Sequence, residues 1–149
     1  MPSIQGNHNG KAAIIMVAII DCARYEAYKE TGTPILTGVT PLRALVDTGA
    51  SKTMIATHVA AQLGLQPVNK LQFGGLGGVT WRPGYLFHVA FYAETPDASN
   101  APSKIHIYRR IINGGELSDE HTFDVLLGMD LLTTGKLIID RNGTFSFSF

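Results

Sequence analysis

The chain has 149 residues, the length of one ordinary domain, and its 12 Lys and Arg residues balance 12 Asp and Glu residues to a formal net charge of zero. Hydrophobic residues make up 45% of the chain, so a buried core is expected, and the single cysteine, Cys22, excludes an intrachain disulfide framework. A neutral chain without a basic run argues against nucleic acid as a partner, and it leaves little charge repulsion to oppose self-association.

The first twenty residues predict an arm followed by a strand. Residues 1–10 are polar and contain glycine and asparagine, which predicts a flexible N-terminal arm before a single domain of residues 11–149. Residues 12–20 form an unbroken apolar run that is too short to cross a membrane, which takes about 20 residues. A signal peptide is the alternative, but Asp21 follows at once and no small-residue cleavage site succeeds it. We therefore expect a buried strand, no membrane association and a cytoplasmic protein with a reduced cysteine.

The next elements are less regular. Residues 21–33 fit either an edge strand or a short helix, and residues 34–46 suggest a bent hairpin interrupted by glycine and proline. A strand resumes at residues 54–55. A short helix then follows, with Thr57 as its predicted N-cap and Gly64 as its end.

The second half of the chain predicts a series of short strands. These are residues 71–85 with a glycine-rich tip at 74–78, then 86–93, 105–112, 123–127, 136–140 and 144–149. Prolines and small polar residues predict surface loops at 94–103 and 113–120, and residues 129–134 fit a short helix. Asn142-Gly143 predicts a hairpin between the last two strands. The expected fold is one mainly β domain.

One segment carries a candidate catalytic group. A hydrophobic strand leads into Asp47, and the chain then turns through Thr48-Gly49. A buried carboxylate needs turn donors, an opposite charge or a shared proton. An ordinary turn, in which Asp47 caps the amides of Gly49 and Ala50, is one explanation, because a three-residue pattern is weak by itself.

Two further motifs in the same order favour another explanation. With the Asp47-Thr48-Gly49 segment, the glycine tip at 74–78 and the run Val125-Leu126-Leu127-Gly128 before a short helix resemble the retropepsin-like aspartic proteases, and in particular their cellular and bacterial members. In that family the glycine tip is a flap over the substrate, and alone it would be read as an ordinary flexible hairpin. The resemblance covers roughly residues 35–149. It implies a closed β-barrel with one or two short helices and a flap hairpin.

The resemblance also implies the chemistry. Aspartic endopeptidases activate a water molecule between two carboxylates that share one proton, without a cofactor or a metal ion. The chain holds one Asp-Thr-Gly triplet, so one copy supplies half of the pair and a homodimer is expected, with Asp47 of each copy at the two-fold axis. Thr48 would lock the two loops together, and Gly49 would allow close approach of the substrate. The five histidines show no metal-ligand spacing.

A peptide or protein is the implied substrate. The resemblance suggests that backbone groups of Gly49, Gly75 and Leu76 hold an extended peptide in β fashion. The side chains expected to line apolar pockets are Leu45, Ala50, Leu76 and Leu126. Hydrophobic residues are therefore expected on both sides of the cut.

The chain departs from the retroviral pattern after the second motif. Many retroviral proteases have Arg-Asn there, and the arginine pairs with an acidic residue after the catalytic triplet. Here Met129-Asp130 occupies those positions and Lys52 follows the triplet, so only a reversed pair between Asp130 and Lys52 is conceivable. The last strand, residues 145–149, could pair across a dimer interface or pack within one copy. A non-catalytic module for peptide binding or assembly is the alternative function.

Overall fold

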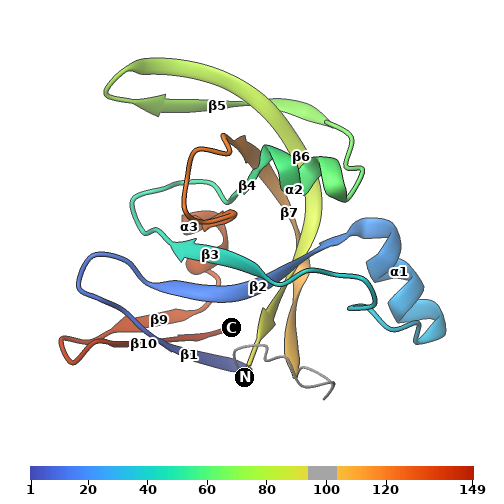
Figure 1. The fold of residues 1–149 in the computed structure, drawn as a ribbon, viewed down its shortest axis with the longest axis horizontal. Coiled ribbons are helices and arrows are strands. Elements are labelled where there is room, and N and C mark those ends of the chain that lie inside the picture. Colours follow the sequence, from blue (N-terminus) through green and yellow to red (C-terminus); the bar gives the residue numbers. More distant parts are fainter. Residues whose placement is uncertain (94–103) are drawn as a thin grey trace.

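Six strands close into a barrel in the computed structural model, which describes residues 1–93 and 104–149 (Figure 1). The larger sheet has the order β2-β3-β8-β4-β7-β6-β5, and pairing of β2 with β6 closes the barrel. Its strands are β2 (Ile14–Asp21), β3 (Leu42–Val46), β4 (Met54–Ala56), β5 (Asn69–Gly75), β6 (Gly78–Tyr92), β7 (Ile105–Leu117) and β8 (Val125–Leu127). The predicted mainly β, closed-barrel fold is confirmed. The loop predicted at 94–103 lies outside the described residues.

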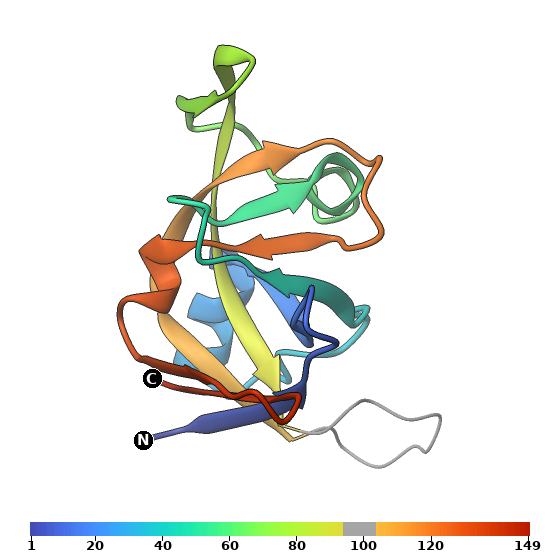
Figure 2. The same ribbon diagram turned by 90° about the vertical axis from the view of Figure 1, so that its left-hand side faces the viewer.

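A smaller sheet is built from both ends of the chain. It has the order β1-β10-β9, with strands β1 (Ser3–Asn7), β9 (Lys136–Ile139) and β10 (Thr144–Ser148). The helices are α1 (Cys22–Thr31), α2 (Thr57–Gln62) and α3 (Met129–Leu132), three where one or two were expected. Figures 1 and 2 show this terminal sheet at one end of the molecule and the β5–β6 hairpin standing out from the other end.

Strand β2 has no polar face because both of its faces are covered. Val17 and Ile19 face the main core inside the barrel, whereas Ala18 and Ile20 pack with Tyr25 of α1 in a second cluster. Two-sided burial is the reason for the unbroken apolar run, and the prediction of a buried strand is confirmed.

Residues 21–33, left open between strand and helix, form helix α1. Asp21 is the N-cap and accepts a hydrogen bond from the Arg24 amide at 2.8 Å. Gly32 ends the helix in the left-handed conformation at φ 67°, with its N–H donating to the Tyr28 carbonyl. Tyr25 is the one buried residue of the helix, and so little burial leaves no periodic apolar face in the sequence.

The N-terminal residues are not a loose arm. Strand β1 pairs antiparallel with β10, and Ile4 is buried in the main core. Gly6 is required in this strand, because a Cβ there would lie 2.6 Å from the Phe145 ring. Pairing with β10 satisfies backbone groups that a free arm would leave to water. Since β1 and β9 occupy both edges of β10, the last strand packs within one copy of the chain.

Three local predictions were wrong. Residues 34–46 contain a turn followed by β3 and form no hairpin, and residues 113–117 continue β7 where a surface loop was expected. Gly114 and Gly115 are buried there, with aromatic rings against their backbones. Thr57 is the first residue of α2 and its hydroxyl donates to the Leu117 carbonyl, so Ala56 is the N-cap. No helix in the described ranges is long and apolar enough to span a membrane.

Candidate active site

Asp47 lies immediately after β3, two residues before Gly49, the first residue of the loop that lines a cleft. Strand β3 runs parallel to β8, with Leu45 opposite Leu126, and the Asp47 amide donates to the Leu127 carbonyl at 3.0 Å. The half-buried carboxylate accepts the Gly49 amide at 2.8 Å, and the Ala50 amide bonds the Asp47 backbone carbonyl instead. The turn thus fixes the side chain through Oδ1. It leaves Oδ2 without a hydrogen bond from the described residues.

The loop after Asp47 is joined to the segment after β8 by main-chain hydrogen bonds. The Met129 amide donates to the Ala50 carbonyl at 2.8 Å, and the Asp130 amide donates to the Ser51 carbonyl at 3.2 Å. The two segments meet so closely that a Cβ on Gly128 would lie 2.5 Å from the carbonyl carbon of Lys52. This contact explains why glycine is needed between the hydrophobic pair of β8 and the short helix α3.

Thr53 connects the same two segments through its side chain. Its hydroxyl donates to Asp130 Oδ1 at 2.8 Å and accepts the Gly128 amide at 3.1 Å, while its own amide also donates to Asp130 Oδ1. Thr53 is fully buried, so these partners satisfy groups that have no access to water. The Asp130 carboxylate is therefore committed to Thr53, and no salt bridge to Lys52 forms in the described part of the chain.

This network was not identified in the sequence. Thr53 directly precedes the apolar residues of β4, and Asp130 directly precedes Leu131 and Leu132 of α3. Polar residues at the start of buried elements need partners inside the fold. The sequence therefore indicated that Thr53 and Asp130 each need a hydrogen-bond partner, but it did not indicate that they bond each other.

The β5–β6 hairpin forms the opposite wall of the cleft. Register pairs Phe73 with Thr80, and alternation along the strands puts both on the face toward the barrel. The ring of Phe73 lies against Gly115 of β7, where a Cβ would overlap it. Val79 and Trp81 point the other way and are 58% and 63% exposed.

The cleft between loop and hairpin has a volume of about 540 Å³. Its lining consists of Gly49, Ala50, Ser51, Lys52, Met54, Phe73, Gly74, Gly75, Gly77, Gly78, Thr80 and Arg82. Three of the predicted substrate-contacting residues, Gly49, Ala50 and Gly75, are thus brought together. Leu45 and Leu126 lie in the strands beneath the loop, and Leu76 is fully exposed at the hairpin tip.

Thr48 and Gly49 are exposed next to the Asp47 carboxylate. Among the described residues, no second carboxylate is hydrogen-bonded to Asp47, Thr48 or Gly49, and the carboxylate of Asp130 is bonded to Thr53. They also bring together no group of three His, Cys, Asp or Glu side chains that could hold a metal ion. Within the described residues, one copy of the chain therefore presents a single carboxylate, Asp47, beside the cleft.

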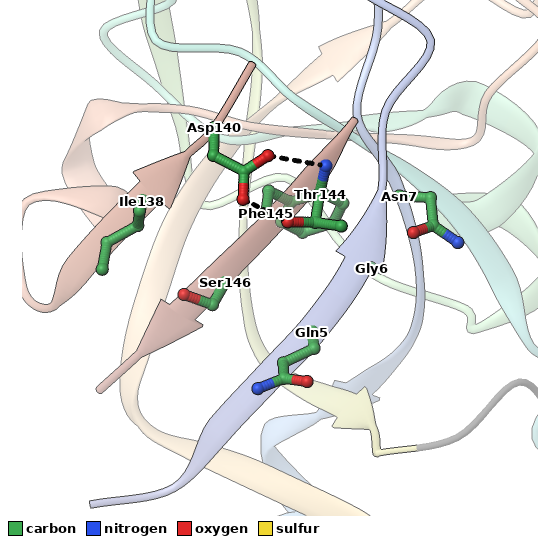
Figure 3. Close-up of a pocket in the computed structure, with 8 residues that line it drawn as sticks. All are labelled: Gln5, Gly6, Asn7, Ile138, Asp140, Thr144, Phe145 and Ser146. Atoms are coloured by element: carbon green, nitrogen blue, oxygen red, sulfur yellow. Dashed lines mark hydrogen bonds between the residues drawn. The ribbon is translucent and has the colours of Figure 1, made fainter. Parts of the chain in front are cut away.

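A second depression, of about 400 Å³, lies on the terminal sheet (Figure 3). Its one ionisable group is Asp140, whose carboxylate accepts hydrogen bonds from Asn142 and Thr144 in the β9–β10 turn. The bond from the Thr144 hydroxyl is the main reason that the pKa of Asp140 lies below its usual value. Both oxygens of this carboxylate accept hydrogen bonds within the turn, so we place the candidate active site at Asp47.

Comparisons with known proteins identify the fold and the family of the chain. A search of curated proteins gave no match. Among solved structures, a retropepsin-like aspartic protease from Rickettsia conorii shares the fold with a TM-score of 0.56 at 17% identity, over 98% of this chain and 90% of that one.

Two other structures match with lower scores. The protease of EIAV bound to the inhibitor HBY-793 has a TM-score of 0.43 at 22% identity, over 90% and 99% of the two chains. The retroviral protease-like domain of Ddi1 from Leishmania major has a TM-score of 0.37 at 12% identity, over 93% and 96%. The aspartyl protease family model matches residues 34–131, well over half of the chain and including Asp47, the hairpin and Gly128, and the chain therefore belongs to the aspartyl protease family.

Proposed function

We propose that the protein is an aspartic endopeptidase that acts as a homodimer, with the Asp47 carboxylates of two copies meeting at a two-fold axis. The observation that supports this best is the position of Asp47: one carboxylate, held at 2.8 Å by the amide of Gly49, and Gly49 itself lines a cleft in an aspartyl protease fold. A second copy related by a two-fold axis supplies the partner carboxylate that one chain lacks.

The paired carboxylates would hydrolyse a peptide bond without a covalent intermediate. Two carboxylates that meet at the axis repel each other when both are ionised, so they hold one proton between them. The ionised one takes a proton from water, whose oxygen attacks the peptide carbonyl carbon, and the protonated one donates its proton to the carbonyl oxygen. As the tetrahedral intermediate collapses, the C–N bond breaks, the now protonated carboxyl gives its proton to the leaving amine, and the ionised one takes a proton from a hydroxyl of the intermediate, which restores the shared proton. The shared proton requires an optimum on the acid side of neutrality.

The surrounding residues would bind and enclose the substrate. The exposed hydroxyl of Thr48 would lock the two loops across the axis, and the backbone of Gly49 and Gly75 would hold an extended peptide between loop and hairpin. The hairpin would serve as a flap, with Leu76 at its tip. Apolar contacts from Leu45, Ala50, Leu76 and Leu126 would favour hydrophobic residues on both sides of the cut.

The alternative is a module that binds peptides or assembles without cleaving them. It is supported by the cleft itself, whose two walls both come from one copy of the chain. A peptide could therefore bind without the second carboxylate.

Replacement of Asp47 by asparagine separates the two functions. Asp47→Asn should lower cleavage of a diverse peptide mixture by at least about a thousandfold between pH 3 and 7, with cut sites identified by mass spectrometry. Asp119→Asn, an exposed carboxylate bonded to His58, is the matched control and should keep the activity.

Circular dichroism and sedimentation should show the same fold and the same dimer for wild type and Asp47→Asn. Residual cleavage by Asp47→Asn, or a wild-type chain that stays monomeric at high concentration with peptide present, would contradict the proposal.

A further inference from the structure

Two cationic side chains line the cleft from opposite walls. Lys52 comes from the loop after Asp47, and Arg82 comes from β6 of the hairpin. The described residues that line the cleft include no Asp or Glu. In a chain with equal numbers of acidic and basic residues, the lining of this cleft carries a charge of +2, and the Asp47 carboxylate lies next to the lining, bonded to Gly49.

Neither cation is neutralised within the described part of the chain. The salt bridges there join Arg24 to Asp21, Lys29 to Glu26, and His58 to Asp119 and Asp124. Asp130, the acidic residue whose amide bonds the neighbouring Ser51, is engaged by Thr53. Lys52 and Arg82 are both half-buried, so water screens them less than it screens a fully exposed charge. They are therefore available to a ligand.

The strand alternation of the hairpin directs Arg82 into the cleft. Arg82 pairs with Leu71 and shares the inner face with Thr80, whereas Trp81 between them is on the outer face. Arg82 lies four residues along β6 from Gly78 at the tip, about 13 Å at the usual strand rise. The backbone of Arg82 is therefore well separated from the hairpin tip.

We propose that the cleft selects peptides with an acidic side chain, Asp or Glu, a few residues from the bond that is cut. The proposal rests on the proposed function for the position of the cut, and the charge of the cleft is independent of it. Arg82 offers a planar fork that matches a carboxylate, and Lys52 adds a second charge across the cleft. In a homodimer the two-fold axis repeats both cations, so acidic residues are favoured on each side of the hydrophobic centre.

A peptide scan tests the proposal. Peptides share a hydrophobic centre and carry one Glu, Gln or Lys at each of four positions on either side. At one or more flanking positions on each side we expect kcat/KM to be about three- to tenfold higher for Glu than for Gln, and lower again for Lys. The advantage of Glu should grow from pH 3 to 6, as a carboxyl with a pKa of about 4.3 ionises, and shrink in 1 M salt.

Variants assign the effect to the two cations. Arg82→Gln and Lys52→Gln should each reduce the advantage of Glu through KM with little change in kcat, and Arg82→Glu should favour Lys instead. Lys70→Gln is the matched control, because Lys70 is on the outer face of the same hairpin and outside the cleft lining. An equal loss in Lys70→Gln would overturn the assignment.

A binding measurement keeps this proposal separate from the catalytic one. Fluorescence anisotropy of labelled Glu and Gln peptides is measured with wild type and with Asp47→Asn. Tighter binding of Glu peptides without any cleavage would overturn the proposed protease function and support the charge selection. Equal binding of Glu and Gln peptides at pH 6 and low salt would overturn the charge selection, whether or not the peptides are cut.

Discussion

The Asp47 loop and the β5–β6 hairpin face each other across the cleft and are attached to the barrel in opposite ways. The loop is bonded to the segment after β8 by main-chain hydrogen bonds and by the buried hydroxyl of Thr53. The β5–β6 hairpin stands out from the barrel (Figure 2) and has an exposed tip. At its base β6 pairs with β7, Asn69 of β5 donates a hydrogen bond to Asn113, and the Phe73 ring packs on Gly115.

This difference fits the two tasks that the proposed function gives to the loop and the hairpin. A catalytic group must stay in place, because small displacements from the reacting geometry cost large factors in rate. A covering element must open to admit a peptide, so it can have only a few packing contacts with the body. The glycines accordingly serve two purposes: Gly128 allows two backbones to touch, whereas those at the hairpin tip have open space around them.

The largest effect is expected where the loop touches the segment after β8. Gly128→Ala places a Cβ 2.5 Å from the Lys52 carbonyl carbon, and a backbone atom cannot move aside as a side chain does. We expect the free energy of unfolding to fall by about 3 kcal/mol and kcat to fall about a hundredfold. Urea denaturation and peptide cleavage measure the two effects.

Gly77→Ala is the control for stability, because open space surrounds a Cβ there. If Gly128→Ala were as stable as Gly77→Ala, the loop would be less tightly held than the hydrogen bonds indicate.

The second largest effect is expected at the Thr53 hydroxyl, which bonds Asp130 and Gly128. Thr53→Val keeps the shape but leaves the Gly128 amide and Asp130 Oδ1 without the hydroxyl. We expect a loss of about 2 kcal/mol in the free energy of unfolding, since buried polar groups would lose a partner. Thr53→Ser retains the hydroxyl and should recover most of the loss, so equal losses in the two variants would contradict this role.

The sequence predicted the β5–β6 hairpin more fully than it predicted how the Asp47 loop is held. The glycine tip between Phe73 and Val79 and the hydrophobic runs before Asp47 and Gly128 are local patterns, and they predicted the barrel strands and the hairpin correctly. The link between Thr53 and Asp130 joins residues 77 positions apart. A pairing of that kind has no local signature, so an ion pair between Asp130 and Lys52 was considered instead.

Two of the wrong predictions have the same physical origin. Gly114 and Gly115 suggested a loop, yet they lie within β7 because aromatic rings from β5 and β6 occupy the space of their side chains. Gly6 suggested a loose arm, yet it is in β1 to make room for the Phe145 ring. In both cases glycine is needed because an aromatic ring from a residue distant in the sequence fills the space of its side chain.

A moderate effect is expected at the contact that holds the hairpin. Gly115→Ala would push the Phe73 ring off β7 and displace the inner wall of the cleft. We expect kcat/KM to fall about tenfold, with a loss of only about 1 kcal/mol in stability, because the ring can move outward. Phe73→Leu in the same chain provides room for the new methyl group, so the double variant should be more active than Gly115→Ala alone. Additive losses would show that this contact does not position the hairpin.

The smallest effect is expected at a surface ion pair between α2 and the segment that joins β7 to β8. His58 of α2 lies between two carboxylates, with Nδ1 at 2.7 Å from Asp119 and Nε2 at 3.2 Å from Asp124. The hydrogen bond to Asp119 is the main cause that raises the pKa of His58 above its usual value. The same bond lowers the pKa of Asp119.

A raised histidine pKa means that the folded chain holds the proton more tightly than the unfolded chain does, so this stabilisation is complete below about pH 6.5 and is lost as the pH rises through the folded pKa. The lowered pKa of Asp119 has the opposite consequence in acid, where stabilisation is lost as the pH falls through the folded pKa. The pair therefore contributes most between about pH 4 and 6.5, within the acid range expected for the proposed activity.

His58→Gln should lower Tm by at most about 2 °C at pH 6 and by less at pH 8, since both side chains are substantially exposed and screened. A double-mutant cycle with Asp119→Asn isolates the pair, and a coupling that stays constant from pH 6 to 8 would mean that the proton on His58 does not link α2 to the barrel.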